Sequence, residues 1–579
     1  MRIQEVIIHN FRSIEHQRIQ LRDFTLIAGE NNAGKTNLIN ALRTFYEDSG
    51  SKYNEKKDLA KFSCKDTEAW IEIEYRLDPE ELESLKEEYR GPESTLRVRR
   101  YFKADDKSLV ESKQSNIYAY EKGTLSKSLF YGAKNVASPK LGQIIYIPEL
   151  VKSADTLKLS GPSPLREIAN FVFKKIVAGS ESMRLLNDSV AALNKEFQEK
   201  SSDQGFNLNG LVEDINKDLN LWDIDFGFRI NDVQPEDIVK NLLEHFVRDR
   251  NLGDQEIDVD NLGQGLQRHI IYTLLKLSAK YVDKLEPKKK DFSPQLTLIL
   301  FEEPEAFLHP TQQEALNRSL RLLSKENQIL ITTHSPTYVS RNVTELPSIV
   351  KVHKEAGRSL LFQIDNSKLA SLHDGNVGLY KHLSELLNDP GVGQDVKASI
   401  RSGSLGDDSP DVAKKLDEEG FKFSLWLDAE RSSCFFAKNI VICEGATEKA
   451  ILDYLLDNKW EDLARERLYI LDALGKFNIH RFMGLFGALG IPHCVLFDGD
   501  SDRSVHQYIN DFIASKKNEF TLSIDRFPVD LETELGLSLP NRKDLKPLMA
   551  LKAIADGNVS EDAINKLRER LVNMVRGAV

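Results

Sequence analysis

Apolar and polar residues divide the first part of the chain into strands and a helix. Residues 3–9 alternate between apolar and polar side chains, and residues 24–28 form the apolar run FTLIA. Both patterns are typical of β-strands. Residues 35–45 then repeat apolar side chains at helical spacing. The pattern predicts two strands on either side of a turn, followed by a helix.

The middle of the chain predicts an α/β domain that a helical segment interrupts. Residues 160–245 space Leu and Phe three and four apart, which indicates a helical insertion. On both sides of it lie short runs rich in Ile, Val and aromatic residues, which favour strands. We expect strands at residues 70–76, 96–102, 143–147, 296–301, 328–333 and 348–353, and a helix at residues 311–324.

The C-terminal part begins with polar, helical sequence. Residues 376–432 have this character, and the Gly-, Ser- and Asp-rich stretch at 402–410 predicts a loop. A second alternation of strands and helices starts at Asn439. The fold class is therefore expected to be α/β, in more than one domain.

Length and composition agree with a cytoplasmic, globular protein. The 579 residues exceed what one core usually supports, and 41% hydrophobic with 29% charged residues is ordinary. No apolar run reaches the roughly 18 residues of a membrane span, and the N-terminus lacks the layout of a secretion signal. The four cysteines form no CxxC pair, so neither a disulfide framework nor a zinc site is expected.

The net charge of -12 argues against a protein that coats nucleic acid, because phosphate binding depends on Lys and Arg. Local basic grooves stay possible, although solvated surface charge is the simpler interpretation. The candidates are Arg97, Arg99, Arg100 and Lys103; residues 288–290; and Arg542, Lys543, Lys546 and Lys552.

A phosphate-binding loop follows the second predicted strand. GENNAGKT at residues 29–36 fits G-x-x-x-x-G-K-[ST] between an apolar strand and a helix, the context that this motif requires. Its backbone N–H groups can surround phosphate oxygens, Lys35 adds charge for the β and γ phosphates, and the Thr36 hydroxyl can hold Mg²⁺. The residues assigned to nucleotide binding here are Gly29, Asn32, Gly34, Lys35, Thr36 and Asn37.

A second apolar strand, in LTLILFEEPE at residues 296–305, ends in two carboxylates. Glu302 is expected to contact magnesium, and Glu303 to act as the base that orients the attacking water. The alternative is a pair of surface glutamates at the start of a loop. Glu302 follows Lys35 by 302 − 35 = 267 residues, so a large insertion separates the two motifs.

Acidic residues also follow two apolar strands near the C-terminus. Glu444 and Glu448 follow the first strand, and Asp498, Asp500 and Asp502 follow the second. Side chains two apart on an extended segment face the same way, so Asp498 and Asp500 can share a cation. Mg²⁺ and Mn²⁺ prefer such oxygen ligands. Either cluster alone can be a helix cap or a surface turn, whereas both together indicate a metal site.

Residues 1 to about 365 resemble the ABC-type ATPases of the SMC and RecF kind. Besides the two motifs above, LGQGLQR at 262–268, with Gly263 and Gly265, is similar to the signature motif but lacks its serine. ITTHSP at 331–336 resembles the segment that carries the switch histidine, here His334. The signature motif acts on the nucleotide of the opposite subunit. The resemblance therefore implies ATP, with Mg²⁺ or Mn²⁺, bound between two heads of a homodimer or a higher homo-oligomer.

The C-terminal part is similar to a Toprim domain, with Glu444 before Gly445, then Gly475, then the Asp498–Asp500 pair. An ABC head joined to a Toprim domain resembles the OLD family of nucleases, which includes Gabija nucleases and nucleases encoded beside retrons. That resemblance implies a further glutamate, chosen as Glu532 over Glu534, and a late lysine, chosen as Lys546 over Lys552. The metal ligands implied at this site are Glu444, Glu448, Asp498, Asp500, Asp502 and Glu532. The implied catalytic residues are Glu444, Glu448, Asp498, Asp500, Glu532 and Lys546 here, and Glu303 in the ATPase site.

The resemblance as a whole implies an ATP-regulated nuclease that cuts double-stranded DNA with two divalent cations, in defence against phage. The partner would be a helicase in a Gabija-like system, or a reverse transcriptase with noncoding RNA in a retron. The alternative is a RecF-like repair ATPase whose Toprim-like domain binds without cutting. The expected domains are an ATPase at 1–375, with a dimerisation insertion at 160–245, a helical linker at 376–435 and a Toprim domain at 436–579.

Overall fold

In the computed structural model, two compact units divide the chain. The first consists of Met1–Glu149 and Lys290–Val579, and the second of Leu150–Lys289. The structure describes residues 1–132, 140–149, 180–199, 208–219, 296–340, 342–408, 429–466, 468–500, 504–538 and 545–576, with shorter stretches between them.

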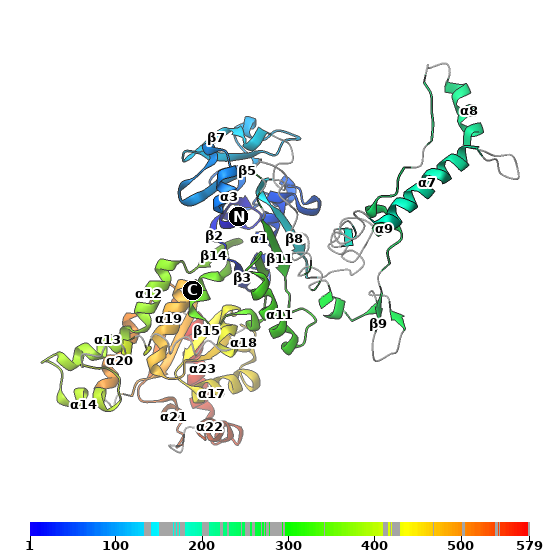
Figure 1. Cartoon of the computed structure of the whole chain (residues 1–579). Helices are drawn as coiled ribbons and strands as arrows, with labels where there is room; N and C mark the ends of the chain where they lie inside the picture. Colours follow the sequence, from blue (N-terminus) through cyan, green and yellow to red (C-terminus); the bar gives the residue numbers. More distant parts are fainter. Residues whose placement is uncertain are drawn as a thin grey trace. The chain divides into compact units, whose positions relative to one another are not determined.

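An antiparallel sheet of six strands opens the first unit, in the order β2-β1-β4-β5-β6-β7 (Figure 1). The turn expected between the first two strands is wrong, because residues 14–20 form β2 and pair with β1. Ile14 and Ile19 of β2 are buried, whereas the polar residues between them mask the strand pattern. The strands are β1 (Arg2–Phe11), β2 (Ile14–Gln20), β4 (Ala69–Arg76), β5 (Thr95–Lys103), β6 (Ile117–Glu121) and β7 (Thr124–Leu129).

A second six-stranded sheet carries the predicted nucleotide motifs, in the order β14-β13-β3-β12-β11-β8. All its neighbours are parallel except β14, which pairs antiparallel with β13. Its three central strands are fully buried, which explains their continuous apolar sequence. The strands are β3 (Phe24–Gly29), β8 (Gln143–Ile147), β11 (Thr297–Glu302), β12 (Gln328–Thr332), β13 (Ile349–Glu355) and β14 (Arg358–Gln363).

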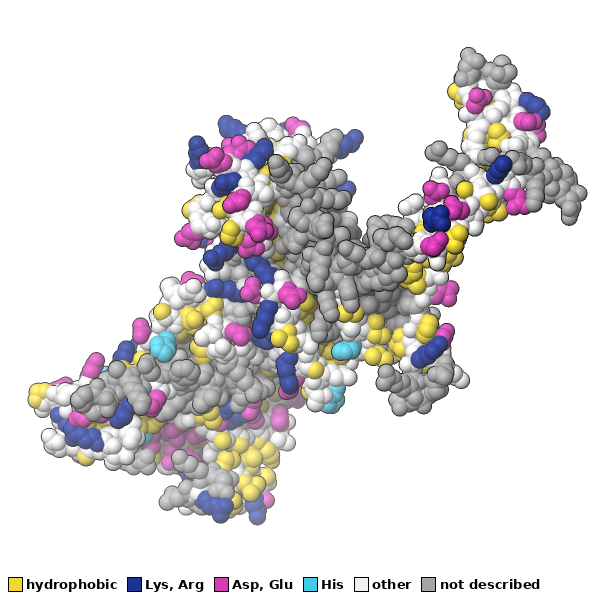
Figure 2. Space-filling view, viewed as in Figure 1, with side chains coloured by type: hydrophobic (Ala, Val, Ile, Leu, Met, Phe, Trp, Pro, Cys, Tyr) yellow, Lys and Arg dark blue, Asp and Glu magenta, His cyan; other side chains and the backbone are white. Residues whose placement is uncertain are grey.

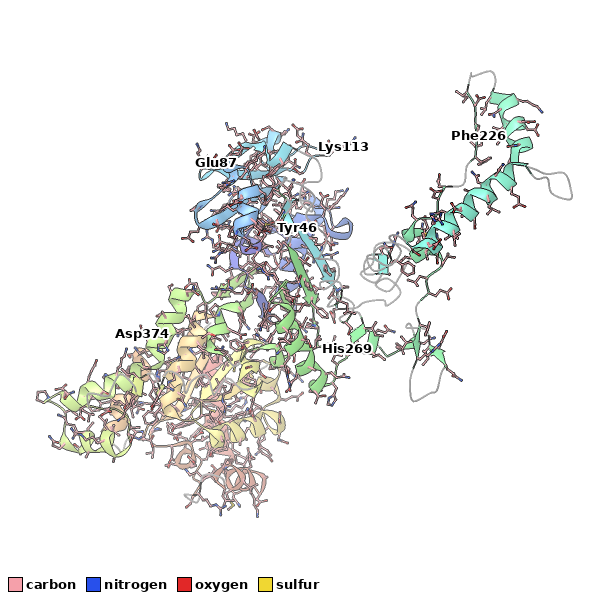
Figure 3. The ribbon with its side chains drawn as sticks, viewed as in Figure 1. Tyr46, Glu87, Lys113, Phe226, His269 and Asp374 are labelled. Atoms are coloured by element: carbon pink, nitrogen blue, oxygen red, sulfur yellow. The ribbon has the colours of Figure 1, made fainter. Side chains whose placement is uncertain are left out.

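The helix α1 (Lys35–Tyr46) joins the two sheets through one hydrophobic core. At its end lies Tyr46, labelled in Figure 3, whose hydroxyl is 2.7 Å from the Tyr75 hydroxyl of β4 and donates to Leu141 O at 3.0 Å. Burial raises the pKa of both tyrosines. A second helix, α11 (Pro310–Leu323), lies between β11 and β12 in the chain, as expected.

The C-terminal domain contains a parallel sheet of four strands, in the order β16-β15-β17-β18. Because β15 and β17 are neighbours, the acidic residues that follow them meet at one edge. Its strands are β15 (Asn439–Cys443), β16 (Leu468–Asp472), β17 (His493–Asp498) and β18 (Thr521–Phe527). Its main helices are α17 (Ala446–Asn458), α19 (Ile479–Ala488), α20 (Ser504–Ser515), α21 (Leu531–Glu534), α22 (Lys546–Ala555) and α23 (Glu561–Arg576).

Helices precede this domain. α12 (Asn366–Asn376) lies almost entirely before the expected helical linker at 376–435, whereas α13 (Gly378–Asn388) and α14 (Gln394–Ser402) lie within it. α12 packs against α19, and α14 packs against α20. The loop expected at 402–410 follows α14, and its last two residues lie outside the described residues. The described helices thus pack on the C-terminal domain in addition to connecting it.

Helices make up much of the described part of the second unit, as the spacing of Leu and Phe predicts. It contains α7 (Glu181–Glu199), α8 (Leu208–Leu219) and α9 (Pro235–Asn241). A two-stranded pairing of β9 (Val247–Arg248) with β10 (Glu256–Ile257) was not expected. None of the described helices has the length and apolarity that crossing a membrane requires.

The basic cluster on β5 is mostly engaged inside the protein. Arg97 Nε and Arg99 Nε donate to the buried Glu72 carboxylate at 2.6 and 2.7 Å, and Arg100 Nη1 donates to Phe45 O at 2.5 Å. Basic and acidic side chains are interspersed over this sheet's surface in Figure 2. This cluster therefore contributes to the fold and supplies little of a basic groove. Lys543 and residues 288–290 lie outside the described residues.

A Glu72→Ala change should lower the free energy of unfolding by about 3 kcal/mol, because it leaves two partly buried guanidinium groups without their carboxylate. Glu72 also accepts from the Tyr120 hydroxyl at 2.8 Å, so three side chains lose a partner. Urea denaturation measures the change. The matched control is Glu87→Ala at an exposed position, labelled in Figure 3. Equal stability of the two variants would contradict a stabilising role for the buried Glu72 carboxylate.

Candidate nucleotide pocket and metal centre

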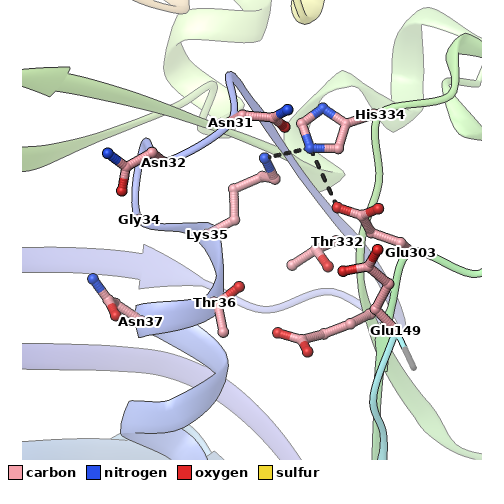
Figure 4. A pocket seen from close by; sticks show the side chains of 11 residues that line it. Asn31, Asn32, Gly34, Lys35, Thr36, Asn37, Glu149, Glu303, Thr332 and His334 are labelled. Atoms are coloured by element: carbon pink, nitrogen blue, oxygen red, sulfur yellow. Dashed lines mark hydrogen bonds and ion pairs between the residues drawn. The ribbon is translucent and has the colours of Figure 1, made fainter. Parts of the chain in front are cut away.

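The carboxyl ends of β3, β11 and β12 form a pocket of about 700 Å³ (Figure 4). Because these strands are parallel neighbours, the segments that follow them lie side by side. Thr36 and Glu302, the two residues expected to hold magnesium, both line this pocket. Its lining residues are Asn31, Asn32, Gly34, Lys35, Thr36, Asn37, Glu149, Glu302, Glu303, Thr332 and His334.

The Lys35 ammonium is held at the floor of the pocket by the loop that precedes it. Nζ donates to Gly29 O at 3.0 Å and to Glu30 O at 2.9 Å, and it lies 2.8 Å from His334 Nε2. Burial lowers the pKa of Lys35 to about 8, against the opposing effect of nearby glutamates such as Glu303. An anion in the pocket would therefore gain a pre-positioned cation.

Gly34 is required by both its backbone and its surroundings. Its φ of 107° lies in the left-handed region, and a Cβ atom there would come within 2.1 Å of Ser359 Oγ. The Ser359 hydroxyl donates to Ala33 O at 2.6 Å and lies 2.7 Å from Ser13 Oγ, while Asn37 Nδ2 donates to Ser13 Oγ at 2.7 Å. Neither serine carries a motif, so their bracing of the loop was missed from the sequence.

Two glutamates extend the pocket at the end of β11. Glu302 accepts from the Tyr146 hydroxyl at 2.7 Å, and Glu303, with φ 44°, places Oε1 at 3.3 Å from His334 Nε2. A third glutamate, Glu305, was not singled out. It accepts from Thr333 Oγ1 at 2.7 Å and from His334 N at 2.6 Å. Glu305 thereby fixes the segment that carries His334.

Gly263 and Gly265 belong to the second unit. Leu266 N donates to Gly263 O at 2.9 Å, and Gly265, Leu266 and Gln267 are helical. The expected contact of these glycines with the nucleotide of another subunit stays a prediction.

In the C-terminal domain, three carboxylates come together. One oxygen each from Glu448, Asp498 and Glu532 lies within 4.8 Å of the others. Glu448 is in the first turn of α17, Asp498 ends β17, and Glu532 is in α21. Lys546 Nζ donates to Glu532 Oε1 at 3.1 Å, whereas Lys552 is exposed and Glu534 is outside the group.

Burial and mutual repulsion make this group unfavourable as charged carboxylates. Burial first, and then Glu448, Glu444 and Glu532, raise the pKa of Asp498 to about 9. Burial likewise raises the pKa of Glu444 to about 7, and Glu444 Oε2 accepts no hydrogen bond among the described residues. Clustered, largely buried carboxylate oxygens are the ligand set that a hard divalent cation needs. The residues therefore fit Mg²⁺ or Mn²⁺.

Asp500 does not continue the extended strand. Its φ of 46° turns the chain, so the expectation that Asp498 and Asp500 face the same way along an extended segment is wrong. Asp500 Oδ2 instead accepts from Lys476 Nζ at 2.6 Å and lies 2.9 Å from His506 Nδ1, and these contacts lower its pKa. Lys476 and His506 were missed, because nothing in a local motif marks them. Asp502 lies outside the described residues.

The fold and these two sites define an ABC-type ATPase head joined to a Toprim domain. The chain belongs to the family described as AAA domain, putative AbiEii toxin, Type IV TA system, whose model matches residues 24–340. A second model, described as Overcoming lysogenization defect protein-like, TOPRIM domain, matches residues 435–500. The expected combination of an ATPase head with an OLD-like Toprim domain is confirmed.

Curated relatives align with most of the chain. Old nuclease of Escherichia phage P2 is 22% identical over 512 residues, which cover 86% of this chain and 77% of that protein. Endonuclease GajA of Bacillus cereus strain VD045 is 22% identical over 517 residues, covering 86% and 75%. OLD nuclease of Thermus scotoductus is 22% identical over 516 residues, covering 86% and 82%.

Cation binding to the nucleotide-free chain should strengthen as the pH rises from about 6 to about 8.5. The pKa values of Asp498 and Glu444 are raised, so protons occupy these groups at low pH and must leave before a cation binds. Because both pKa values are raised in the folded state, protonated Glu444 and Asp498 stabilise the metal-free fold at low pH. This stability is fully present below the pKa values of the unfolded chain and is lost as the pH rises through about 7 for Glu444 and about 9 for Asp498.

The measurement is the rise in Tm on adding Mn²⁺ at the two pH values, which should be clearly larger at the higher one. Asp498→Asn should remove most of this pH dependence. A rise in Tm that is larger at low pH would refute the assignment of these carboxylates as ligands.

Proposed function

We propose that this chain is an ATP-regulated, divalent-metal-dependent DNA endonuclease. The observation that carries the proposal is the convergence of Glu448, Asp498 and Glu532, with Lys546 beside Glu532. A platform that only bound DNA would favour basic residues at these strand ends, because phosphate contacts depend on Lys and Arg. The relatives named nucleases, which align with most of the chain, support the same reaction class.

The residues divide the chemistry of phosphodiester hydrolysis among them. Glu448, Asp498 and Glu532 would hold a divalent cation, and Glu444 with Asp500 would hold a second. Bound cations supply Lewis-acid stabilisation and lower the pKa of bound water. Lys546 is close enough to the site, through Glu532, to offset the negative charge that builds on the phosphate.

The ATPase head has its own division of labour. Asn32, Gly34 and Asn37 line the pocket and, with Gly29, would shape the loop around the phosphates, while Lys35 would contribute the charge. Thr36 and Glu302 would hold Mg²⁺, Glu303 would orient the attacking water, and His334 would lie near the γ-phosphate. His334 contacts both Lys35 and Glu303, which supports a common site for these three groups.

We extend the proposal to a homodimer with ATP between the heads, completed by Gly263 and Gly265 of the opposite subunit. Exposed leucines on the helices of the second unit support an interface there, because apolar side chains at helical spacing favour helix packing. They are Leu185, Leu186 and Leu193 on α7 and Leu211 on α8. The proposed substrate is double-stranded DNA. The proposed partner is a helicase, or a retron reverse transcriptase with its noncoding RNA, and the proposed role is phage defence in the cytoplasm.

Regulation requires a physical connection between the nucleotide pocket and the Toprim domain. The His334 ring lies 6.5 Å from the Phe436 ring, centroid to centroid, and Phe436 is three residues before β15. In the same segment, Phe435 O accepts a hydrogen bond from the buried Lys351 ammonium at 2.6 Å. A shift of His334 on binding or loss of the γ-phosphate would therefore reach the start of the Toprim sheet.

Asp498→Asn should reduce cleavage of plasmid DNA in Mn²⁺ or Mg²⁺ by at least about a hundredfold while leaving ATP hydrolysis intact. Lys35→Ala should instead reduce ATP hydrolysis by at least about a hundredfold and leave cation binding at the Toprim site intact. Gel analysis of nicked and linear plasmid, with and without ATP, measures the first effect. ATP-dependent DNA binding without any cleavage would instead support a RecF-like, non-cleaving protein.

Phe436→Ala should bring the ratio of cleavage rates with and without ATP to about one, because it removes the ring that contacts His334. ATP hydrolysis and metal-dependent DNA cleavage should both persist. Phe436→Tyr keeps the ring and should keep the wild-type ratio. If Phe436→Ala preserves that ratio, the connection runs elsewhere.

A further inference from the structure

The acidic edge of the Toprim sheet has two halves with different built-in charge. The half made by Glu448, Asp498 and Glu532 has three carboxylates and one ammonium, that of Lys546, whose side chain is 33% exposed. The half made by Glu444 and Asp500 has two carboxylates and the Lys476 ammonium, whose side chain is 1% exposed. The first half is therefore short of positive charge, whereas the second already contains a buried cation.

Lys476 is held in the second half from three sides. Its Nζ donates to Asp500 Oδ2 at 2.6 Å and lies 3.3 Å from His506 Nδ1 and 3.9 Å from Glu444 Oε2. His506 itself contacts Asp500 Oδ2 at 2.9 Å. The three partners come from α20 and from the ends of β15 and β17, so the ammonium sits between separate elements of the domain.

The backbone fixes where Lys476 enters the site. It follows Gly475, whose φ of 108° is in the left-handed region and whose N–H donates to Glu444 O at 2.7 Å. The lysine backbone is thus tied to the strand end that supplies Glu444. A flexible surface lysine would have no such anchor.

A divalent cation and this ammonium compete for the same oxygens. Asp500 Oδ2 already accepts a hydrogen bond from Lys476 Nζ, and a cation bound between Glu444 and Asp500 would contact the same carboxylate oxygens. Two cations this close in a partly buried site repel each other strongly. A metal ion can enter this half only if the ammonium moves away.

We propose that Lys476 ranks the two halves for metal binding: the first divalent cation binds Glu448, Asp498 and Glu532, and the second enters between Glu444 and Asp500 only by displacing the Lys476 ammonium. This inference rests on the proposed function, since it assumes a metal-binding Toprim site. Lys476 is a positioning residue here. It sets the order in which the site loads, and through that order the concentration of free cation at which a two-cation site is complete.

The test is a titration of the full-length, nucleotide-free chain with Mn²⁺. Binding is measured from the electron paramagnetic resonance signal of the Mn²⁺ that stays free. All proteins carry Thr36→Ala, so that the nucleotide pocket does not contribute. With Lys476 present, two binding steps should differ in Kd by at least about tenfold. Lys476→Met should bring the second Kd to within about threefold of the first, whereas Lys476→Arg, which keeps the charge, should preserve the separation.

Three outcomes would overturn the ranking: two equal binding steps with Lys476 present, a second step that Lys476→Met leaves unchanged or weakens, or the same effect from Met and Arg. If Lys476→Met fails to fold, the protein that keeps Lys476 still tests the order of binding. At one equivalent of Mn²⁺ its spectrum should be that of isolated bound ions, and a coupled Mn²⁺ pair at this ratio would refute the order.

Asp498→Asn separates this inference from the proposed function. It should abolish the tighter step. If Mn²⁺ binding is absent from the chain, or unaffected by Asp498→Asn, the metal centre itself is wrong and the ranking falls with it. If Asp498→Asn abolishes the tighter step but Lys476→Met changes nothing, only the ranking is wrong.

Discussion

Parallel pairing of neighbouring strands is the constraint on which both candidate sites depend. Because β3, β12 and β11 run in one direction side by side, the loop after β3, the segment after β12 and the glutamates after β11 meet at one edge of their sheet. The pairing of β15 with β17 does the same for the acidic residues of the Toprim domain. Motifs that lie far apart in the chain thus become neighbours through the pairing of their strands.

Each site also contains a buried lysine that is already satisfied inside the protein. Lys35 uses the carbonyl oxygens of Gly29 and Glu30, and Lys476 uses the Asp500 carboxylate. The difference lies in their partners. Lys35 donates to neutral carbonyl oxygens, whereas Lys476 donates to a carboxylate that a metal ion would also bind. The same residue type therefore favours an anion in one site and opposes a cation in the other.

Much of the architecture was predictable because buried parallel strands have long apolar sequences. The strands that form the nucleotide edge and the helix α1 lie where the pattern places them. The strand β2 was missed because its exposed face is polar, and β6 and β7 were not expected. In the C-terminal domain, Asp500 departed from expectation because its backbone leaves the strand at Gly499, which spacing along the chain does not reveal.

The sequence by itself determined the two chemistries and most of their residues, since a phosphate-binding loop and a spaced acidic set need particular side chains in a particular order. Only the tertiary structure decided which of those side chains lie together in each site. It grouped Glu448 and Asp498 with Glu532, turned Asp500 toward Lys476 and His506, and placed Phe436 beside His334. These pairings depend on backbone turns and on contacts between distant elements, and neither can be predicted from local composition or periodicity.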